Sequence, residues 1–219
     1  MSKNKNNLIK SKSRVQNFGE VFTSDKEVNN MVNLFSHELL RPESRFLETA
    51  CGEGNFLIKI LKQKLSSVAS NYKKNQLDYE RYSTLAISSL YGIDIINENV
   101  QTTIINLEKI VFENFLIFFK DLKMDYKRSI NFILKKNITH GDALTLTTVS
   151  EKLKPIIFSE WSFITSSLIK RRDFSFKHLI ETRPFDGFNL FSDLGEKAFI
   201  PEPVKEFKPI NFLKVYEQK

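Results

Sequence analysis

The stretch from Phe46 to Phe56, which reads FLETACGEGNF, places the strongest constraint on how this chain folds. Two apolar residues lead into the acidic Glu48, and a tight Gly52-Glu53-Gly54 loop follows before an apolar run at helical spacing. Glycine lets a backbone turn sharply and leaves room for a ligand against the loop amides. The pattern therefore predicts a strand, a ligand-binding loop and a helix.

The acidic residue at the end of this strand indicates which kind of ligand suits the loop. A carboxylate favours a positive charge or ribose hydroxyls and repels phosphate. A dinucleotide fingerprint would read G-x-G-x-x-G and would bring pyrophosphate to the start of the helix. The position of Glu48 therefore favours S-adenosylmethionine over a dinucleotide.

Composition limits the class of protein. The 219 residues suffice for one α/β domain, and 41% hydrophobic with 27% charged residues is ordinary for a folded soluble protein. The longest apolar runs, such as 115–119, are too short to cross a bilayer, and residues 1–5 lack the apolar centre of a signal peptide. One cysteine excludes an internal disulfide and a cysteine-based zinc site, and the three histidines lack metal-ligand spacing. We therefore expect a cytoplasmic protein without a membrane segment or a metal.

The chain is basic, with a formal net charge of +7. Basic residues gather at 3–14, at 120–136 and at Lys170-Arg171-Arg172. Such clusters arise from a solvated lysine-rich surface or from a nucleic-acid footprint, in which clustered cations release counterions from a phosphate backbone. Charge alone does not separate these two interpretations.

Hydrophobic periodicity predicts strands that alternate with helices, and hence a parallel sheet wound with helices. The expected strands are 46–48, 90–95, 138–143 and 155–161. The expected helices are one from Val28 to Leu39 capped by Thr23 or Ser24, one after the glycine loop, one through 100–111 and one within 115–136. The largely polar residues 66–89 indicate an insertion that is helical in part.

The same pattern suggests a division of the chain into three parts. Residues 1–13 are polar and lysine-rich, as expected of a mobile basic arm. Residues 14–165 are expected to form the cofactor-binding domain. Residues 166–219 contain Pro201, Pro203 and Pro209, so they either remain irregular or complete the sheet.

Three expected strands end in an acid at the edge where parallel sheets bind ligands: Glu48, Asp94 and Asp142. Asp94 is placed to accept hydrogen bonds from ribose hydroxyls, and Asp142 from an adenine amino group. The alternative for each is a helix cap or a turn former. Because five of only seven glycines stand at these joints, we favour a pocket: Gly19, Gly52, Gly54, Gly92 and Gly141.

These motifs resemble, in order, those of the N6-adenine-specific DNA methyltransferases of restriction–modification systems. Residues 46–56 resemble the cofactor-binding motif, and residues 18–24 the upstream motif that closes over the methionine end of S-adenosylmethionine. Residues 90–95 and 137–144 resemble the second and third motifs. The resemblance implies a Rossmann-like class I methyltransferase sheet wound with helices, here incomplete after the fourth strand. It also implies S-adenosyl-L-methionine as methyl donor and adenine in DNA as acceptor. The residues it assigns to the cofactor are Phe22, Thr23, Glu48, Ala50, Gly52, Gly54, Asn55, Phe56, Asp94, Ile95, Asp142 and Ala143.

The chain departs from the family at the catalytic motif, Asn/Asp-Pro-Pro-Tyr/Phe, because it contains no Pro-Pro pair. In the family, the polar side chain and a backbone carbonyl accept hydrogen bonds from the target amino group, and the aromatic ring stacks on the flipped base. The corresponding place here reads Phe158-Ser159-Glu160-Trp161. One hypothesis makes Glu160 the acceptor and Trp161 the stacking platform. The alternative is that Trp161 is a core or rim aromatic and the catalytic chemistry is lost.

The expected function is an adenine-specific DNA methyltransferase of a restriction–modification system. Cys51 follows Ala50 rather than a proline and lies in the cofactor loop, which argues against cytosine C5 methylation and for a small buried residue. The residues after Trp161 are too few for both a complete sheet and a target-recognition region, so specificity would come from a partner subunit or a second copy. Lys170, Arg171 and Arg172 are the candidate phosphate contacts. The alternatives are an inactive cofactor-binding subunit or remnant, and a methyltransferase for RNA or protein.

Overall fold

The computed structural model describes residues 23–150, 152–181 and 201–218. The mobile arm expected at residues 1–13 and the upstream motif as far as Phe22 lie outside these residues. Within them, no helix is long and apolar enough to cross a membrane.

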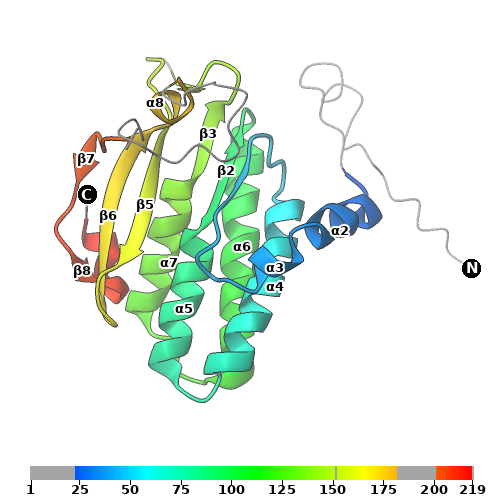
Figure 1. Ribbon diagram of the computed structural model, residues 1–219, viewed down its shortest axis with the longest axis vertical. Coiled ribbons are helices and arrows are strands. Elements are labelled where there is room, and N and C mark those ends of the chain that lie inside the picture. Colours follow the sequence, from blue (N-terminus) through cyan, green and yellow to red (C-terminus); the bar gives the residue numbers. More distant parts are fainter. Residues whose placement is uncertain (1–22, 151, 182–200, 219) are drawn as a thin grey trace, which may run out of the picture.

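The first sheet carries the three strands that end in acids (Figure 1). Its order is β1-β2-β3-β4; the first three strands are parallel, and β4 is antiparallel to β3. These strands are β1 (Phe46–Glu48), β2 (Leu90–Asp94), β3 (Ile138–Asp142) and β4 (Thr147–Thr148). The described fold is therefore mixed α/β with a mostly parallel four-stranded sheet, and the first three expected strands are confirmed.

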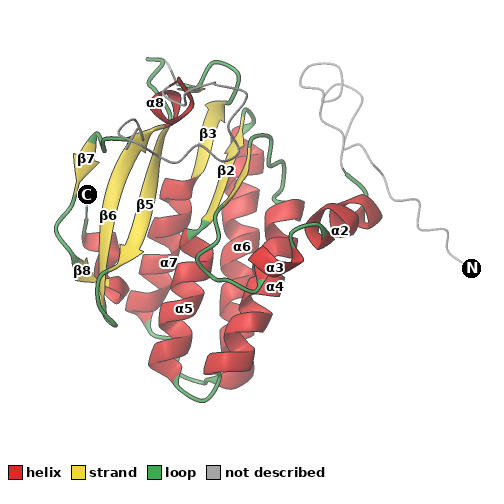
Figure 2. Cartoon of the chain, in the orientation of Figure 1, coloured by secondary structure: helices red, strands yellow, loops and turns green. Residues whose placement is uncertain are grey.

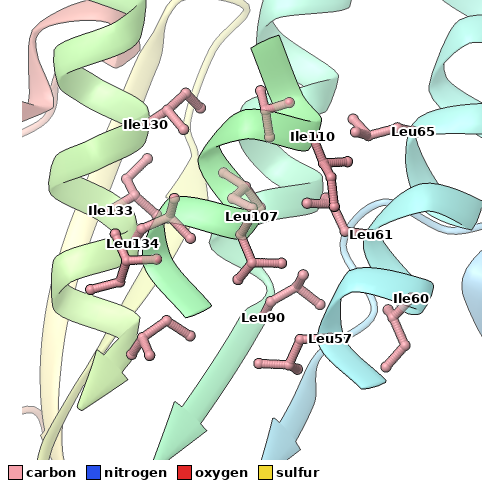
Figure 3. Packing of buried hydrophobic residues seen from close by; sticks show 14 of the residues in the cluster. Leu57, Ile60, Leu61, Leu65, Leu90, Leu107, Ile110, Ile130, Ile133 and Leu134 are labelled. Carbon is pink, nitrogen blue, oxygen red and sulfur yellow. The ribbon is translucent and has the colours of Figure 1, made fainter. Parts of the chain in front are cut away.

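Four long helices lie along the chain between these strands (Figure 2). They are α4 (Asn55–Tyr72), α5 (Gln76–Ser88), α6 (Asn97–Phe118) and α7 (Met124–Asn137). Their apolar stripes bury one another and one face of the sheet, as Figure 3 shows for Leu57 of α4, Leu107 of α6, Leu134 of α7 and Leu90 of β2. This core fixes the ends of β1 and β2 against the starts of α4 and α6.

Residues 66–89 are part of this core, rather than a polar insertion that is only partly helical. They continue α4 and form α5, in which Tyr79 is fully buried among aromatic rings. Two of the polar residues that suggested an insertion bond to their own helix. Ser83 Oγ donates to the Tyr79 carbonyl at 2.5 Å, and Thr84 Oγ1 donates to the Glu80 carbonyl at 2.7 Å.

The N-terminal helix begins as expected but ends early. Ser24 caps α2 (Asp25–Asn33) in a capping box with Glu27: each residue's side chain accepts from the other's backbone N–H. The single helix expected through Leu39 is wrong, because the chain breaks before α3 (Ser36–Leu39).

The chain after β4 forms a second, antiparallel sheet. The strand expected over 155–161 exists as β5 (Ile157–Phe163), but it pairs with β6 (Leu168–Ser175) and does not continue the parallel sheet. The boundary expected at residue 165 falls in the turn between these two paired strands. The remaining elements are α8 (Phe176–Glu181), β7 (Lys205–Glu206), β8 (Ile210–Asn211) and the 3-10 helix η1 (Phe212–Glu217). The strands after residue 165 therefore belong to this antiparallel sheet and do not continue the parallel one.

Two buried polar side chains fasten the second sheet to the first. Asn137 Nδ2 donates to the carbonyls of Ser88 and Leu90 at 3.0 Å each, and its Oδ1 accepts from Trp161 Nε1 at 3.0 Å. The Tyr91 hydroxyl donates to the Ser159 carbonyl at 2.9 Å. These bonds join β5 to the beginnings of β2 and β3.

Lys64 of α4 is fully buried and joins the chain segments before β1 and β2. Its Nζ donates to the carbonyls of Pro42, at 3.0 Å, and of Ser44, and to Ser89 Oγ at 2.6 Å. Burial lowers the pKa of Lys64 to about 7. Lys64 therefore donates to three acceptors while its own charge is poorly solvated.

We expect Lys64→Met to lower the free energy of unfolding by on the order of 2 kcal/mol at about pH 9, because the Ser44 carbonyl loses the donor that Lys64 supplies and the Pro42 carbonyl keeps only Ser89 Oγ. The native pKa of about 7 lies below the ordinary 10.5, so the unfolded chain binds more protons between these values. The free energy of unfolding of the wild type therefore falls as the pH drops towards 7. The difference between the wild type and Lys64→Met becomes smaller as a result. Urea denaturation at both pH values measures this, with the exposed Lys62→Met as control. An equal deficit at both would contradict the assigned cause.

Candidate functional site

The carboxylate of Asp94, at the end of β2, holds the glycine loop in place. Its Oδ2 accepts from the Gly52 N–H at 2.7 Å, and its Oδ1 accepts from the Ile96 N–H at 2.8 Å. The Asn99 side-chain amide donates to the same Oδ1 at 3.3 Å. Asp94 is buried, so these bonds satisfy a charge that water scarcely reaches. Its role in the structure is to join the ends of β1 and β2.

Helix α6 supports the loop from the other side. Thr103 Oγ1 donates to the Gly52 carbonyl at 2.9 Å, and Asn106 Nδ2 donates to the Glu53 carbonyl at 3.2 Å. These two residues and Asn99 were not among those predicted from the sequence. A signal for them exists, because polar positions 99, 103 and 106 recur at helical spacing on one face of α6.

The two loop glycines are required for different reasons. Gly54 caps α4 with φ +83°, and a Cβ there would lie 2.8 Å from Thr103 Cγ2. Gly52 has φ +53°, but nothing lies within 4 Å of the position of its Cβ. Gly54 thus permits close packing on α6, whereas Gly52 borders open space.

Glu48, the acid at the end of β1, is the side chain of the site that lacks a partner. Its Oε2 is buried and makes no hydrogen bond within the part of the chain that the structure describes. Burial, and then the negative charge of Asp94, raise the pKa of Glu48 to about 8. The carboxyl group therefore keeps its proton near neutral pH, and a bound cation would favour its ionised form.

One oxygen of Asp142 acts as a turn former, which was the alternative to ligand binding. Its Oδ1 accepts from the Leu144 N–H at 2.8 Å, which shapes the loop after β3. His140 of the same strand contacts the Ile95 carbonyl through Nε2 at 3.1 Å. The ends of β2 and β3 are thereby joined, and no hydrogen bond links Asp142 directly to Glu48 or Asp94 among the described residues.

The other residues assigned to the cofactor lie outside this hydrogen-bonded cluster. Those that are exposed or half-buried after the strand ends and at the start of α4 are Ala50, Asn55, Ile95 and Ala143. Phe56 instead packs against the main core. Thr23 is exposed ahead of α2 and does not join the cluster, and Phe22 lies outside the described residues. The structure thus brings together Glu48, Gly52 and Asp94.

Cys51 is a small buried residue, as the sequence indicated. Its thiol has a pKa raised to about 12 by burial and by the charges of Asp94 and Glu48. A Cβ on Gly92 would come within 3.1 Å of its sulfur. A thiol held this way is a poor nucleophile at neutral pH.

Glu160 and Trp161, which one hypothesis makes the substitutes for the catalytic motif, both have their side chains engaged by other residues. Trp161 is only 5% exposed, its Nε1 is bonded to Asn137, and the Arg171 guanidinium lies 5.7 Å from the centre of its ring. The Glu160 carboxylate is ion-paired with Arg45 and, at 2.5 Å, with Arg172. Trp161 has no free face for a base, and two cations occupy the Glu160 carboxylate.

The run Lys170-Arg171-Arg172 does not form a free basic patch. Strand alternation turns Arg171 inward, where it is 4% exposed and donates to both oxygens of Asp173 at 2.8 and 2.7 Å. Lys170 pairs with Glu206 at 2.7 Å, and Arg172 pairs with Glu160. Each of the three cations predicted to contact phosphate therefore has an acidic partner in the structure.

Comparisons with known proteins assign no family to this site. No family model matches the chain, and neither the curated proteins nor the solved structures contain a significant match. In the described residues, no three His, Cys, Asp or Glu side chains gather as a metal site would require. The case for a function rests on the geometry above.

We expect Gly54→Ala to lower the free energy of unfolding by on the order of 3 kcal/mol and Gly52→Ala by about 1 kcal/mol, because both strain φ but only Gly54 meets a neighbour. That neighbour is the Thr103 methyl group. Adding Thr103→Ser to Gly54→Ala should recover part of the loss. Chemical denaturation of the three variants measures this, and equal losses for the two glycines would contradict the packing argument.

We expect the contribution of Glu48 to the free energy of unfolding to fall as the pH rises from about 4.5 to about 8. The native carboxyl keeps a proton that the unfolded chain has lost, so its stabilising contribution is complete below the lower value and is lost through the upper one. Glu48→Gln should flatten this slope and be more stable than wild type by on the order of 1–3 kcal/mol at about pH 8.5. Denaturation across this range tests it, with the exposed Glu113→Gln as control. An unchanged slope in Glu48→Gln would refute the assignment.

Proposed function

We propose that this chain binds S-adenosyl-L-methionine as the cofactor-binding subunit of an adenine-specific DNA methyltransferase. The observation that carries the proposal is the buried Glu48 oxygen without a partner, beside a loop whose amides are fixed by Asp94. A buried carboxyl in this state suits a ligand that brings a positive charge. S-adenosyl-L-methionine carries an ammonium and a sulfonium group.

The residues of the site fit such a cofactor. Glu48 would accept from the ammonium group, and the open space at Gly52 would admit the ligand against the loop. Asp94 Oδ2, which accepts only from the Gly52 N–H among the described residues, has a second lone pair that would accept from a ribose hydroxyl. Ile95, exposed directly after Asp94, would offer an apolar surface to the adenine ring.

The strand order supports a Rossmann-like class I fold. The sequence β3-β2-β1 is the first half of the doubly wound order 3-2-1-4-5-6, in which ligands lie beyond the carboxyl ends of the strands. Glu48 and Asp94 stand at that edge. We therefore extend the observed mixed α/β architecture to this class as part of the proposal.

The proposal gives this chain the role of a subunit because its candidate acceptor groups are engaged elsewhere. When bound, S-adenosyl-L-methionine supplies an electrophilic methyl group on its sulfonium. The chain has no Pro-Pro motif to accept from a target amine, and Glu160 and Trp161 are occupied by ion pairs and core packing. The groups that orient DNA adenine would come from a partner chain.

Calorimetric titration with S-adenosyl-L-methionine tests the cofactor. We expect binding that is weakened at least about tenfold by Glu48→Gln, since a hydrogen bond to a charged group contributes about 1.5–3 kcal/mol. Because free Glu48 holds a proton, binding should release about one proton near pH 7 in wild type but not in the variant. Buffers of different ionisation enthalpy report this release, and Glu113→Gln is the control. Absent binding, or equal binding by Glu48→Gln, would reject the proposal.

Transfer of labelled methyl groups tests the role. We expect no transfer by the chain alone, and transfer to adenine in DNA once a competent partner subunit is added. DNA methylation by the chain alone would show that it carries its own acceptor groups. Transfer to RNA or protein instead would replace DNA as the substrate.

A further inference from the structure

The outer edge of β1 is open in the described part of the chain. The register Phe46↔Leu90 and Glu48↔Gly92 directs the main-chain groups of Phe46 and Glu48 towards β2, with Phe46 N–H bonded to the Ser89 carbonyl at 3.0 Å. The N–H and C=O of Leu47 therefore point outwards, and no described residue bonds to them. The Leu47 side chain is 42% exposed. An edge of this kind is a template for another strand.

A pocket of about 720 Å³ lies beside this edge. Leu47 and Tyr91 of the first sheet form one side, and aromatic residues of the second sheet and apolar residues of α8 form the other. The apolar and aromatic lining includes Leu47, Tyr91, Phe158, Phe174, Phe176 and Leu179. A strand added to β1 would thus have both main-chain partners and a pocket for its side chains.

The charges at the pocket favour an acidic occupant. Arg45 and Arg172 flank the single carboxylate of Glu160, which leaves an excess of one positive charge. A second copy of this chain would bring the same excess, on a protein of net charge +7. Charge complementarity therefore points to a different chain that carries carboxylates.

We infer that the outer edge of β1 and its pocket bind an extended segment of an acidic partner protein, which adds a strand beside Leu47. This is the position at which the second half of a doubly wound sheet begins, next to the loop at Gly52. The segment would place an apolar side chain in the pocket and a carboxylate near Arg45 and Arg172. The inference stands on the sheet edge, the pocket and the charges, and it does not require that the loop bind a cofactor.

Amide hydrogen exchange of the full chain, followed by NMR, tests whether the edge is free. The Leu47 amide should exchange much faster than the Ile93 amide of the central strand β2. A protected Leu47 amide in the isolated monomer would show that the chain covers its own edge. A dimer in sedimentation experiments that protects Leu47 would show a second copy there. Either result would overturn the inference.

A synthetic peptide, Thr-Glu-Thr-Phe-Thr-Glu-Thr, tests the chemistry of the partner. Its alternation presents Glu, Phe and Glu on one face in either strand direction. It should protect the Leu47 amide with a Kd of about 1 mM or tighter, and the same peptide with Lys for Glu should not. Leu47→Lys should abolish binding, whereas Leu77→Lys, at a residue 51% exposed on α5, should not change it.

Arg45→Gln provides a second variant that leaves the edge backbone and the Glu160–Arg172 pair intact. It should weaken the acidic peptide about fivefold or more, as expected for the loss of one charged contact of about 1 kcal/mol. Failure of the acidic peptide to bind, or equal binding of the lysine peptide, would overturn the inference. S-adenosyl-L-methionine binding is measured separately on the same variants, so failure here is distinguishable from failure of the proposed function.

Discussion

The contact between the end of β2 and the loop after β1 is the constraint on which the site depends. Asp94 accepts the Gly52 N–H, and Gly92 leaves room for Cys51 and Leu57 to approach the strand. The nearby Glu48 is half-buried, its Oε2 has no hydrogen-bond partner among the described residues, and burial followed by the charge of Asp94 raises its pKa. Buried acids left unsatisfied are rare and often mark functional sites.

The second constraint is the reversal of the chain after β3. The short β4 and the loop before Pro155 return the chain as β5, which pairs with β6 rather than with an edge of the parallel strands. The described chain therefore has three parallel strand ends, beside which the proposed cofactor would lie. The outer side of β1 remains without a strand in the described residues. The proposed function depends on the strand ends, and the proposed interface depends on this unpaired edge.

The loop, the strands and most helices were predictable because their signals are local. Glycine spacing, an acid after an apolar run and a capping residue such as Ser24 depend on neighbours in sequence. The helix α5 was harder to predict, because Ser83 and Thr84 are polar in sequence but bond to their own helix. The role of Trp161 was not predictable locally, because it is decided by Asn137 and Arg171, which lie on other elements.

The sequence by itself determined the glycine loop after β1. Its features depend on a few consecutive residues: the positive φ at Gly52 and Gly54, and the acid at the end of β1. Only the tertiary structure decided which of the candidate groups are free. Asp94 is engaged by backbone amides, Glu160 by two arginines and Trp161 by the core, whereas Glu48 keeps an unpaired oxygen. The physical reason is that the hydrogen-bond and ion-pair partners of a polar side chain are often residues distant in sequence, which only the folded chain brings together.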